Sequence, residues 1–218
     1  MALFRFSDPL AEAPALSSGN LRLRAPRLSD YEQWARLRDE SRSFLAAWEP
    51  IWPADELSRE SYKRRIKRYA EEMRRDEAYP FFLIRENDQV LLGGLTLGFL
   101  RRGVAQAATL GYWIGAPHAQ RGHMGAAVRL ALSFAFGHLG LQRVEAACLP
   151  HNDASIRLLD RVGFHREGLA RRYLCINGRW QDHLLFAILS TDPIPPPLPR
   201  SRHNNLDNSP VSVSRTAQ

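Results

Sequence analysis

The chain has little of what several protein classes require. It has only two cysteines, Cys148 and Cys175, and no hydrophobic run approaches the ~20 residues of a membrane-spanning helix. Both cysteines lie in apolar stretches without metal-ligand spacing, so we interpret them as buried thiols and expect no metal site. The chain also lacks the GxGxxG and GK[ST] loops, so neither hydride transfer nor nucleotide hydrolysis is supported.

The composition is typical of one globular domain. The chain has 218 residues, 44% of them hydrophobic and 24% charged, which is enough for one well-buried core and too short for two ordinary domains. The first 18 residues interrupt their apolar pattern with acids and an arginine, unlike a signal peptide. We therefore expect a cytoplasmic protein without a membrane partner.

The positive charge of the chain has two interpretations. A net charge of +7 suits an acidic partner such as ribosomal RNA, or an anionic cofactor. However, residues 61–75 hold seven of the basic residues beside acids, a pattern that is typical of a solvated helix face. We favour the second interpretation and expect no direct nucleic-acid specificity.

Composition also divides the chain into three parts. The segment 193–218 lacks periodicity and is rich in Pro, Ser and Asn, which predicts a disordered tail. The segment 1–19 is predicted to be loosely ordered, because it shows no sustained periodicity. One domain at 20–192 remains.

Hydrophobic periodicity within this domain predicts both helices and strands. The helical segments are two short helices within 28–50, with Ser29 as N-cap, and longer helices near 58–76, 125–140 and 152–163. The strands are 20–26, 79–86, 89–101, 108–115, 142–150, 169–178 and 180–189. Three successive strands form a meander, and Asn177-Gly178 turns the last hairpin. This order predicts an α/β fold with a mixed sheet and helices on both faces.

The stretch "AQRGHMGAA" (119–127) lies between a strand and a helix and could bind an anion. A helix start presents free backbone N–H groups and a partial positive charge, which suit a phosphate. Gly122 and Gly125 keep side chains away from these amides, and Arg121 adds a cationic donor. A plain strand-to-helix turn explains the loop equally well.

A second motif adds to this loop. The loop is followed by Asn-x-x-Ser-x-x-Leu-Leu-x-x-x-Gly-Phe at 152–164, and the order and spacing of the two resemble the GCN5-related N-acetyltransferase (GNAT) superfamily. The stretches "SRSFLAAWEPIWP" and "RRYLCINGRWQDHLLFAIL" resemble its RimJ/RimL branch of ribosomal-protein N-terminal acetyltransferases. The resemblance covers roughly residues 20–190.

The resemblance implies a mostly antiparallel sheet whose fourth and fifth strands splay apart at 111–115 and 145–150. It implies acetyl-CoA as cofactor, with the pantetheine arm bonded in the splay by strand addition and the pyrophosphate on the loop amides. The residues assigned to the coenzyme are Trp113, Ile114, Gly115, Gln120, Arg121, Gly122, His123, Met124, Gly125, Ala126, Asn152 and Ser155. A plain helix N-cap is the alternative for Asn152.

Two positions depart from the family pattern. Ala119 replaces the first Arg or Gln of the loop, which removes a side-chain contact and leaves the backbone amides. Leu159 replaces the tyrosine that serves many relatives as general acid. Ser155 is therefore a candidate proton donor to the leaving sulfur, although a serine near a helix start often bonds the backbone. Glu145 is a candidate base acting through water, with an outward-facing strand residue as the alternative.

Three residues between the early helices are candidates for binding the acceptor. Trp48 and Trp52 would form aromatic walls and Glu49 would attract an ammonium group, although tryptophans are commonly core residues. The resemblance implies transfer of acetyl from acetyl-CoA to a protein N-terminus, such as that of a ribosomal protein, and association with the ribosome. The alternatives are an acetyltransferase of a small amine, such as an aminoglycoside or polyamine, and a non-catalytic acyl-CoA- or RNA-binding module.

Overall fold

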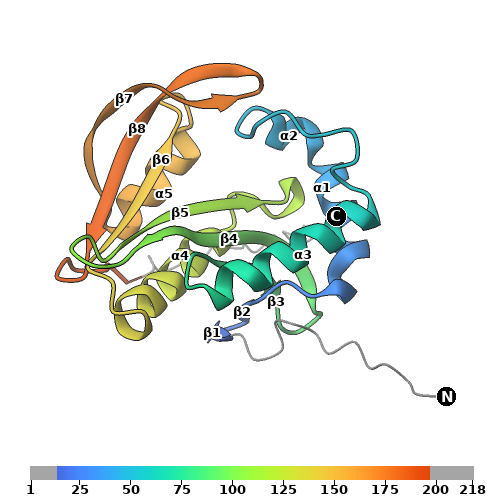
Figure 1. The fold of residues 1–218 in the computed structure, drawn as a ribbon, viewed down its shortest axis with the longest axis horizontal. Coiled ribbons are helices and arrows are strands. Elements are labelled where there is room, and N and C mark those ends of the chain that lie inside the picture. Colours follow the sequence, from blue (N-terminus) through green and yellow to red (C-terminus); the bar gives the residue numbers. More distant parts are fainter. Residues whose placement is uncertain (1–13, 197–218) are drawn as a thin grey trace, which may run out of the picture.

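An eight-stranded sheet with helices on both faces dominates the computed structural model, which describes residues 14–196 (Figure 1). Its strands are β1 (Leu16–Ser18), β2 (Leu21–Arg24), β3 (Tyr79–Arg85), β4 (Val90–Arg101), β5 (Ala107–Ile114), β6 (Arg143–Cys148), β7 (His165–Ile176) and β8 (Arg179–Leu189). Its helices are α1 (Tyr31–Glu40), α2 (Arg42–Ala46), α3 (Arg59–Arg74), α4 (His123–Ser133) and α5 (Asp153–Val162). The ends predicted to be loosely ordered or disordered, 1–19 and 193–218, lie mostly outside the described residues.

The strand order is β1-β2-β3-β4-β5-β6-β8-β7, and β5 with β6 is the one parallel pair among the described strands. The predicted mixed α/β sheet, its β3–β5 meander and the final hairpin are confirmed. Asn177 and Gly178 have φ values of 45° and 75°, as a two-residue turn between twisted strands requires. The short strand β1 was not predicted.

The sheet opens between β5 and β6, as the resemblance implied. The two strands pair only from Ala107–Arg143 to Leu110–Ala146. Beyond Leu110, β5 follows β4 alone, while β6 follows β8 as far as Cys148. Figure 1 shows the two halves of the sheet diverging from this point. The splay leaves one edge of β5 without a strand partner.

Two hydrophobic clusters hold the helices against opposite faces. Small residues of α4, among them Ala127 and Ala131, are completely buried and let this helix lie close to the sheet with α5 beside it. On the other face, Trp34 of α1 and Tyr62 of α3 pack against β3 and β4. A Cβ atom at Gly115 would lie 2.4 Å from a Leu37 methyl carbon, so this glycine lets α1 approach the end of β5. Helix α1 is thereby packed closely against the end of the splayed strand.

Two local predictions were wrong. Ser29 lies inside a 3-10 turn, and α1 begins after Asp30, whose carboxylate accepts a hydrogen bond from the Arg27 N–H (2.8 Å) and pairs with Arg24. Cys175 is exposed, because it lies on β7, the edge strand, whereas Cys148 is buried as predicted. No helix within residues 14–196 is long and apolar enough to span a membrane.

Candidate active site

The open edge of β5 presents backbone groups to the splay. The Gly115 N–H donates to the Leu92 carbonyl (2.8 Å) and the Gly115 carbonyl accepts from His118, so the main chain of Gly115 is already bonded. Successive residues of a strand direct their N–H and C=O groups to alternate sides. Ile114 and Tyr112 therefore face the opening, while Trp113 faces β4. Of the three residues assigned to the pantetheine arm, the geometry favours Ile114 and argues against Gly115.

The loop before α4 leads into a helix start without a side-chain cap, a geometry that suits an anion. Gly122 is the N-cap, has φ = 79° and contributes no side-chain cap to the helix. A Cβ atom at this position would meet nothing within 4 Å, so the space beside the Gly122 Cα atom is open. The Met124 side chain is buried in the core, which leaves its amide alone as a possible contact. This uncapped start of an 11-residue helix fits a pyrophosphate.

Charges of both signs lie near this loop, where Arg85 and Arg121 are opposed by Asp88 and Glu40. Burial and the charges of Arg85 and Arg121 lower the pKa of His118, which precedes the loop. The imidazole therefore favours its neutral form. Gln120 and Arg121 lie in the turn between His118 and the start of α4.

The first turn of α5 holds both residues predicted on it. Asn152 is the N-cap, and its Oδ1 accepts from the Ser155 N–H at 3.1 Å. The capping alternative is therefore confirmed. No residue within 14–196 accepts from the Asn152 Nδ2, which leaves this donor for a carbonyl of the coenzyme. Asn152 can serve both roles.

Ser155 bonds a side chain that sequence reasoning missed. Its Oγ forms a short hydrogen bond with the hydroxyl of Tyr112, which extends from β5 across the splay. Burial raises the pKa of Tyr112 well above its ordinary value, so the phenol stays protonated. Burial also raises the pKa of Cys148 to about 11. A hydrogen bond from Ser155 lowers this pKa, but burial has the larger effect. Three neutral proton donors thus meet where the strands part.

Tyr112 could have been found only from a contact between distant segments. The position on α5 where many relatives have a tyrosine holds Leu159, which is completely buried in the core. The "GYWI" motif placed Tyr112 on the splayed strand, but nothing in the sequence indicates that it meets a residue 43 positions away.

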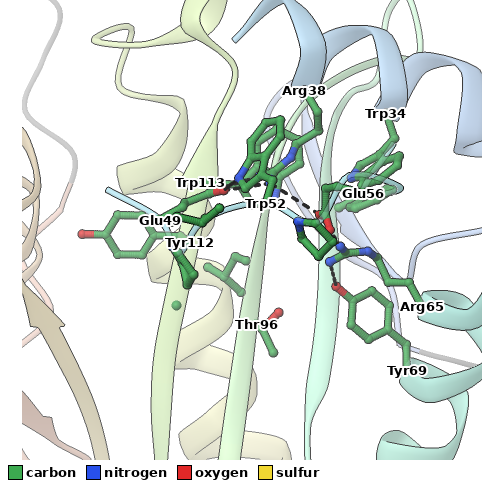
Figure 2. Close-up of a pocket in the computed structure, with 16 residues that line it drawn as sticks. Trp34, Arg38, Glu49, Trp52, Glu56, Arg65, Tyr69, Thr96, Tyr112 and Trp113 are labelled. Atoms are coloured by element: carbon green, nitrogen blue, oxygen red, sulfur yellow. Dashed lines mark hydrogen bonds and ion pairs between the residues drawn. The ribbon is translucent and has the colours of Figure 1, made fainter. Parts of the chain in front are cut away.

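A pocket of about 330 Å³ opens on the face of the sheet that α1 and α3 cover. Thr96 and Gly111 form part of its floor, and the segment 49–53 with Trp113 forms its walls. Figure 2 shows Arg38 between the rings of Trp52 and Trp113, and the Tyr112 ring directed away from the other labelled side chains. Tyr112 also lines the pocket, and its hydroxyl reaches from there to Ser155.

Two of the three predicted acceptor residues line the pocket, and the third packs elsewhere. Trp52 lines the pocket, while Trp48 packs against His151 with ring centroids 5.6 Å apart. Glu49 also lines the pocket, but both of its oxygens bond Arg38 (2.8 and 2.7 Å), and one also accepts from the Trp52 indole (2.7 Å). The prediction that Glu49 attracts an ammonium is therefore not supported, because its charge is already paired. Arg38 was not singled out, because a helical arginine resembles a surface residue in sequence.

Glu145 lies outside the splay. It pairs with Thr109 in the closed part of the sheet, and its carboxylate bonds Arg101 (2.5 Å) and Arg143 (2.8 Å). Burial favours its neutral form, but these two arginines outweigh burial and lower the pKa of Glu145. A carboxylate with a lowered pKa is a weak base, so the geometry favours the alternative of a structural strand residue.

Comparisons with known proteins agree with this arrangement. Residues 20–165 match the family model of the acetyltransferase (GNAT) domain. The probable N-acetyltransferase YjcK of Bacillus subtilis (strain 168) is 37% identical over 177 residues, which are 81% of this chain and 98% of YjcK. The [ribosomal protein uS5]-alanine N-acetyltransferase of Escherichia coli (strain K12) is 32% identical over 75% of this chain and 85% of its own length.

A solved structure is similar in fold as well. Mycobacterium smegmatis RimJ, in complex with CoA-disulfide, superposes with a TM-score of 0.75 and 32% identity over 81% of this chain and 86% of that chain. Such neighbours carry coenzyme A, and the uncapped α4 amides and open β5 edge fit the same group here. The chain therefore belongs to the GNAT acetyltransferase family and is an N-acetyltransferase that uses acetyl-CoA.

Proposed function

We propose that the acceptor is the N-terminal α-amino group of a protein, with a ribosomal protein as the substrate. The charge balance of the pocket carries this proposal. Its lining includes two glutamates, Glu49 and Glu56, and two arginines, Arg38 and Arg65. Each glutamate forms an ion pair with an arginine, so the pocket has no surplus of negative charge.

This balance separates a protein N-terminus from a small polyamine. A polyamine or aminoglycoside carries several cationic groups and requires unpaired acids for binding. An α-amino group carries one charge at most and, with a pKa near ~8, is already partly neutral at pH 7. A neutral pocket with aromatic walls suits the second acceptor. The uS5-alanine acetyltransferase activity named for the E. coli relative supports the same choice.

Residues of this chain would bind the coenzyme and supply a proton to the leaving group. The amides of the first α4 turn and the Ile114 main chain would hold the coenzyme, which supplies an acetyl thioester. The Asn152 Nδ2 would fix its arm beside Ser155. The Ser155 Oγ–H would give its proton to the leaving thiolate sulfur, and a hydrogen bond from the Tyr112 hydroxyl would stabilise the charge left on that oxygen. The proton lost by the amine would return to Ser155 through water. No side chain is assigned as general base, since a partly neutral α-amine needs little help.

A ribosomal-protein acceptor would place the reaction in the cytoplasm and bring the enzyme to the ribosome. Direct RNA binding is not part of the proposal. Five of the seven basic side chains in 61–75 form ion pairs with acids: Arg64, Arg65, Arg68, Arg74 and Arg75. These pairs support the interpretation of this segment as a solvated helix face.

The experiment is a competition between acceptors. N-terminal peptides of ribosomal proteins, including uS5, would be incubated with acetyl-CoA and the full chain beside spermidine and an aminoglycoside. We expect mass spectrometry to show acetylation of a peptide α-amine, with matching thiol release. Faster thiol release with either small amine than with every peptide would overturn the proposal.

A further inference from the structure

The segment 47–57, here called the acceptor loop, connects α2 to α3 and crosses the opening of the sheet. The Asn177 N–H, at the tip of the β7–β8 hairpin, donates to the Glu49 carbonyl at 2.9 Å. Trp48 packs on His151, which precedes α5. The acceptor loop therefore begins on one half of the splayed sheet and contacts the other half.

Glu49 is the residue at which these contacts converge. Its carbonyl bonds the hairpin, its two carboxylate oxygens bond Arg38, and one of them also bonds the Trp52 indole. The side chains of Glu49 and Arg38 are 20% and 8% exposed, so water screens this pair weakly. Figure 2 shows the pair beside the two tryptophan rings, at the pocket wall.

Arg38 depends on Glu49 for its charge balance. Its guanidinium carbon lies 4.2 Å and 5.0 Å from the centroids of the Trp52 and Trp113 rings. The other nearby carboxylate, Glu56, is 3.8 Å away and is already bonded by Arg65. Without Glu49, the pocket wall would hold an incompletely paired cation facing the approaching amine.

We propose that Glu49 is a positioning residue, which fastens the acceptor loop across the splay and neutralises Arg38, and does not bind the acceptor ammonium. The predicted effect of Glu49 on acceptor binding rests on the proposed function. The role of Glu49 in holding the loop concerns the protein without ligand, so it can be tested without any acceptor.

The first test is hydrogen exchange followed by mass spectrometry on the full chain without ligands. Glu49→Gln should increase deuterium uptake in peptides that cover 47–57 and the hairpin tip near Asn177. A neutral amide holds Arg38 less firmly, so the loop, with the main-chain bond from Asn177 to residue 49, should open more often. Asp55→Asn is the matched control, since Asp55 lies in the same loop but pairs with Arg64 in an exposed ion pair. Unchanged uptake in Glu49→Gln, or equal increases in both variants, would overturn the fastening role.

The second test is kinetic and uses the acceptor found by the competition experiment. Glu49→Gln should raise the acceptor KM about tenfold and leave the KM for acetyl-CoA unchanged, because the unpaired Arg38 repels the amine. The double variant Arg38→Gln/Glu49→Gln should recover part of this increase, since the repelling charge is gone. An acceptor KM at least as high in the double variant would show direct contact between Glu49 and the ammonium and overturn the proposal. If no protein acceptor is found, the exchange result still decides the role of Glu49.

Discussion

At the scale of single residues, polar side chains from distant segments meet at the splay. Tyr112 comes from β5 and Ser155 from α5, and their hydroxyl groups share a hydrogen bond. The family's usual tyrosine position holds Leu159, so Tyr112 brings a phenol to the α5 terminus from another strand. A buried phenol with a raised pKa is a stable donor rather than a titrating group.

Tyr112→Phe should lower kcat about tenfold, because Ser155 loses the hydrogen bond that supports its release of a proton. Thiol release at saturating acetyl-CoA and acceptor measures this change. Tyr79→Phe is the control, since the Tyr79 hydroxyl also bonds a side chain, Asp76, but lies on β3. A kcat equal to that of the unmodified protein would remove Tyr112 from the mechanism.

Gly122→Asp should weaken acetyl-CoA binding by about 10- to 100-fold, because a carboxylate would face the pyrophosphate on the same amides. Isothermal titration calorimetry measures the affinity. Gly103→Asp is the matched control, because Gly103 also has a positive φ (63°) and open space around its Cβ position. Equal affinity in the two variants would show that the loop is only a turn.

At the scale of elements, two helix starts face the splay and differ in their caps. α4 begins with a glycine that supplies no side-chain cap, whereas the Asn152 side chain caps α5. An uncapped start favours an anion, and a capped start fixes the Ser155 hydroxyl in place. The proposed function accordingly uses the α4 start for the pyrophosphate and the α5 start for the coenzyme arm and the Ser155 proton.

Two substitutions at Asn152 separate its roles. Asn152→Asp keeps an oxygen to accept from the Ser155 N–H but removes the Nδ2 donor, so thermal stability should stay near that of the unmodified protein while acetyl-CoA affinity falls. Asn152→Ala removes both groups and should also destabilise the protein by about 1 kcal/mol. Thermal unfolding and calorimetry measure the two effects. An unchanged acetyl-CoA affinity in Asn152→Asp would show that Asn152 only caps α5.

At the scale of the whole molecule, an ion-pair chain links strands on both sides of the splay. Arg101 of β4 bonds Glu145 of β6, and Arg143 of β6 bonds both Glu145 and Glu167 of β7. Burial opposes the charged form of Glu145, but the arginines prevail and lower its pKa; the hydrogen bonds of Arg143 lower that of Glu167. Both carboxylates therefore favour the folded state while they are charged.

Stability should fall as the pH drops below the ordinary glutamate value of 4.5. A carboxyl group with a lowered folded-state pKa stabilises the protein fully above its unfolded pKa, and this contribution disappears as pH falls through the folded pKa. Urea unfolding of the full chain and of Glu145→Gln/Glu167→Gln, at pH 7 and at several values below 4.5, measures the difference. The difference in the free energy of unfolding between the two proteins should become smaller in acid. A difference that does not change with pH would contradict a stabilising role of these ion pairs.

Much of the fold could be predicted because the pattern is local. The alternating strand at 79–86, the Asn177-Gly178 turn and the amphipathic segment near 58–76 each carry their signal within a few residues. Ser29 was misplaced because the Asp30 carboxylate competes for the helix start through Arg24 and Arg27. The exposure of Cys175 was missed because a strand's place at a sheet edge is not written in its own sequence.

By itself, the sequence determined the order of elements, the Gly122 loop and the spacing to Asn152 and Ser155, because backbone geometry and helix starts depend on neighbouring residues. Only the tertiary structure decided which polar groups are free and which are paired. It joined Tyr112 to Ser155, paired Glu49 with Arg38 and paired Glu145 with Arg101. These contacts join segments far apart in the chain, and only packing of the whole fold brings such partners together.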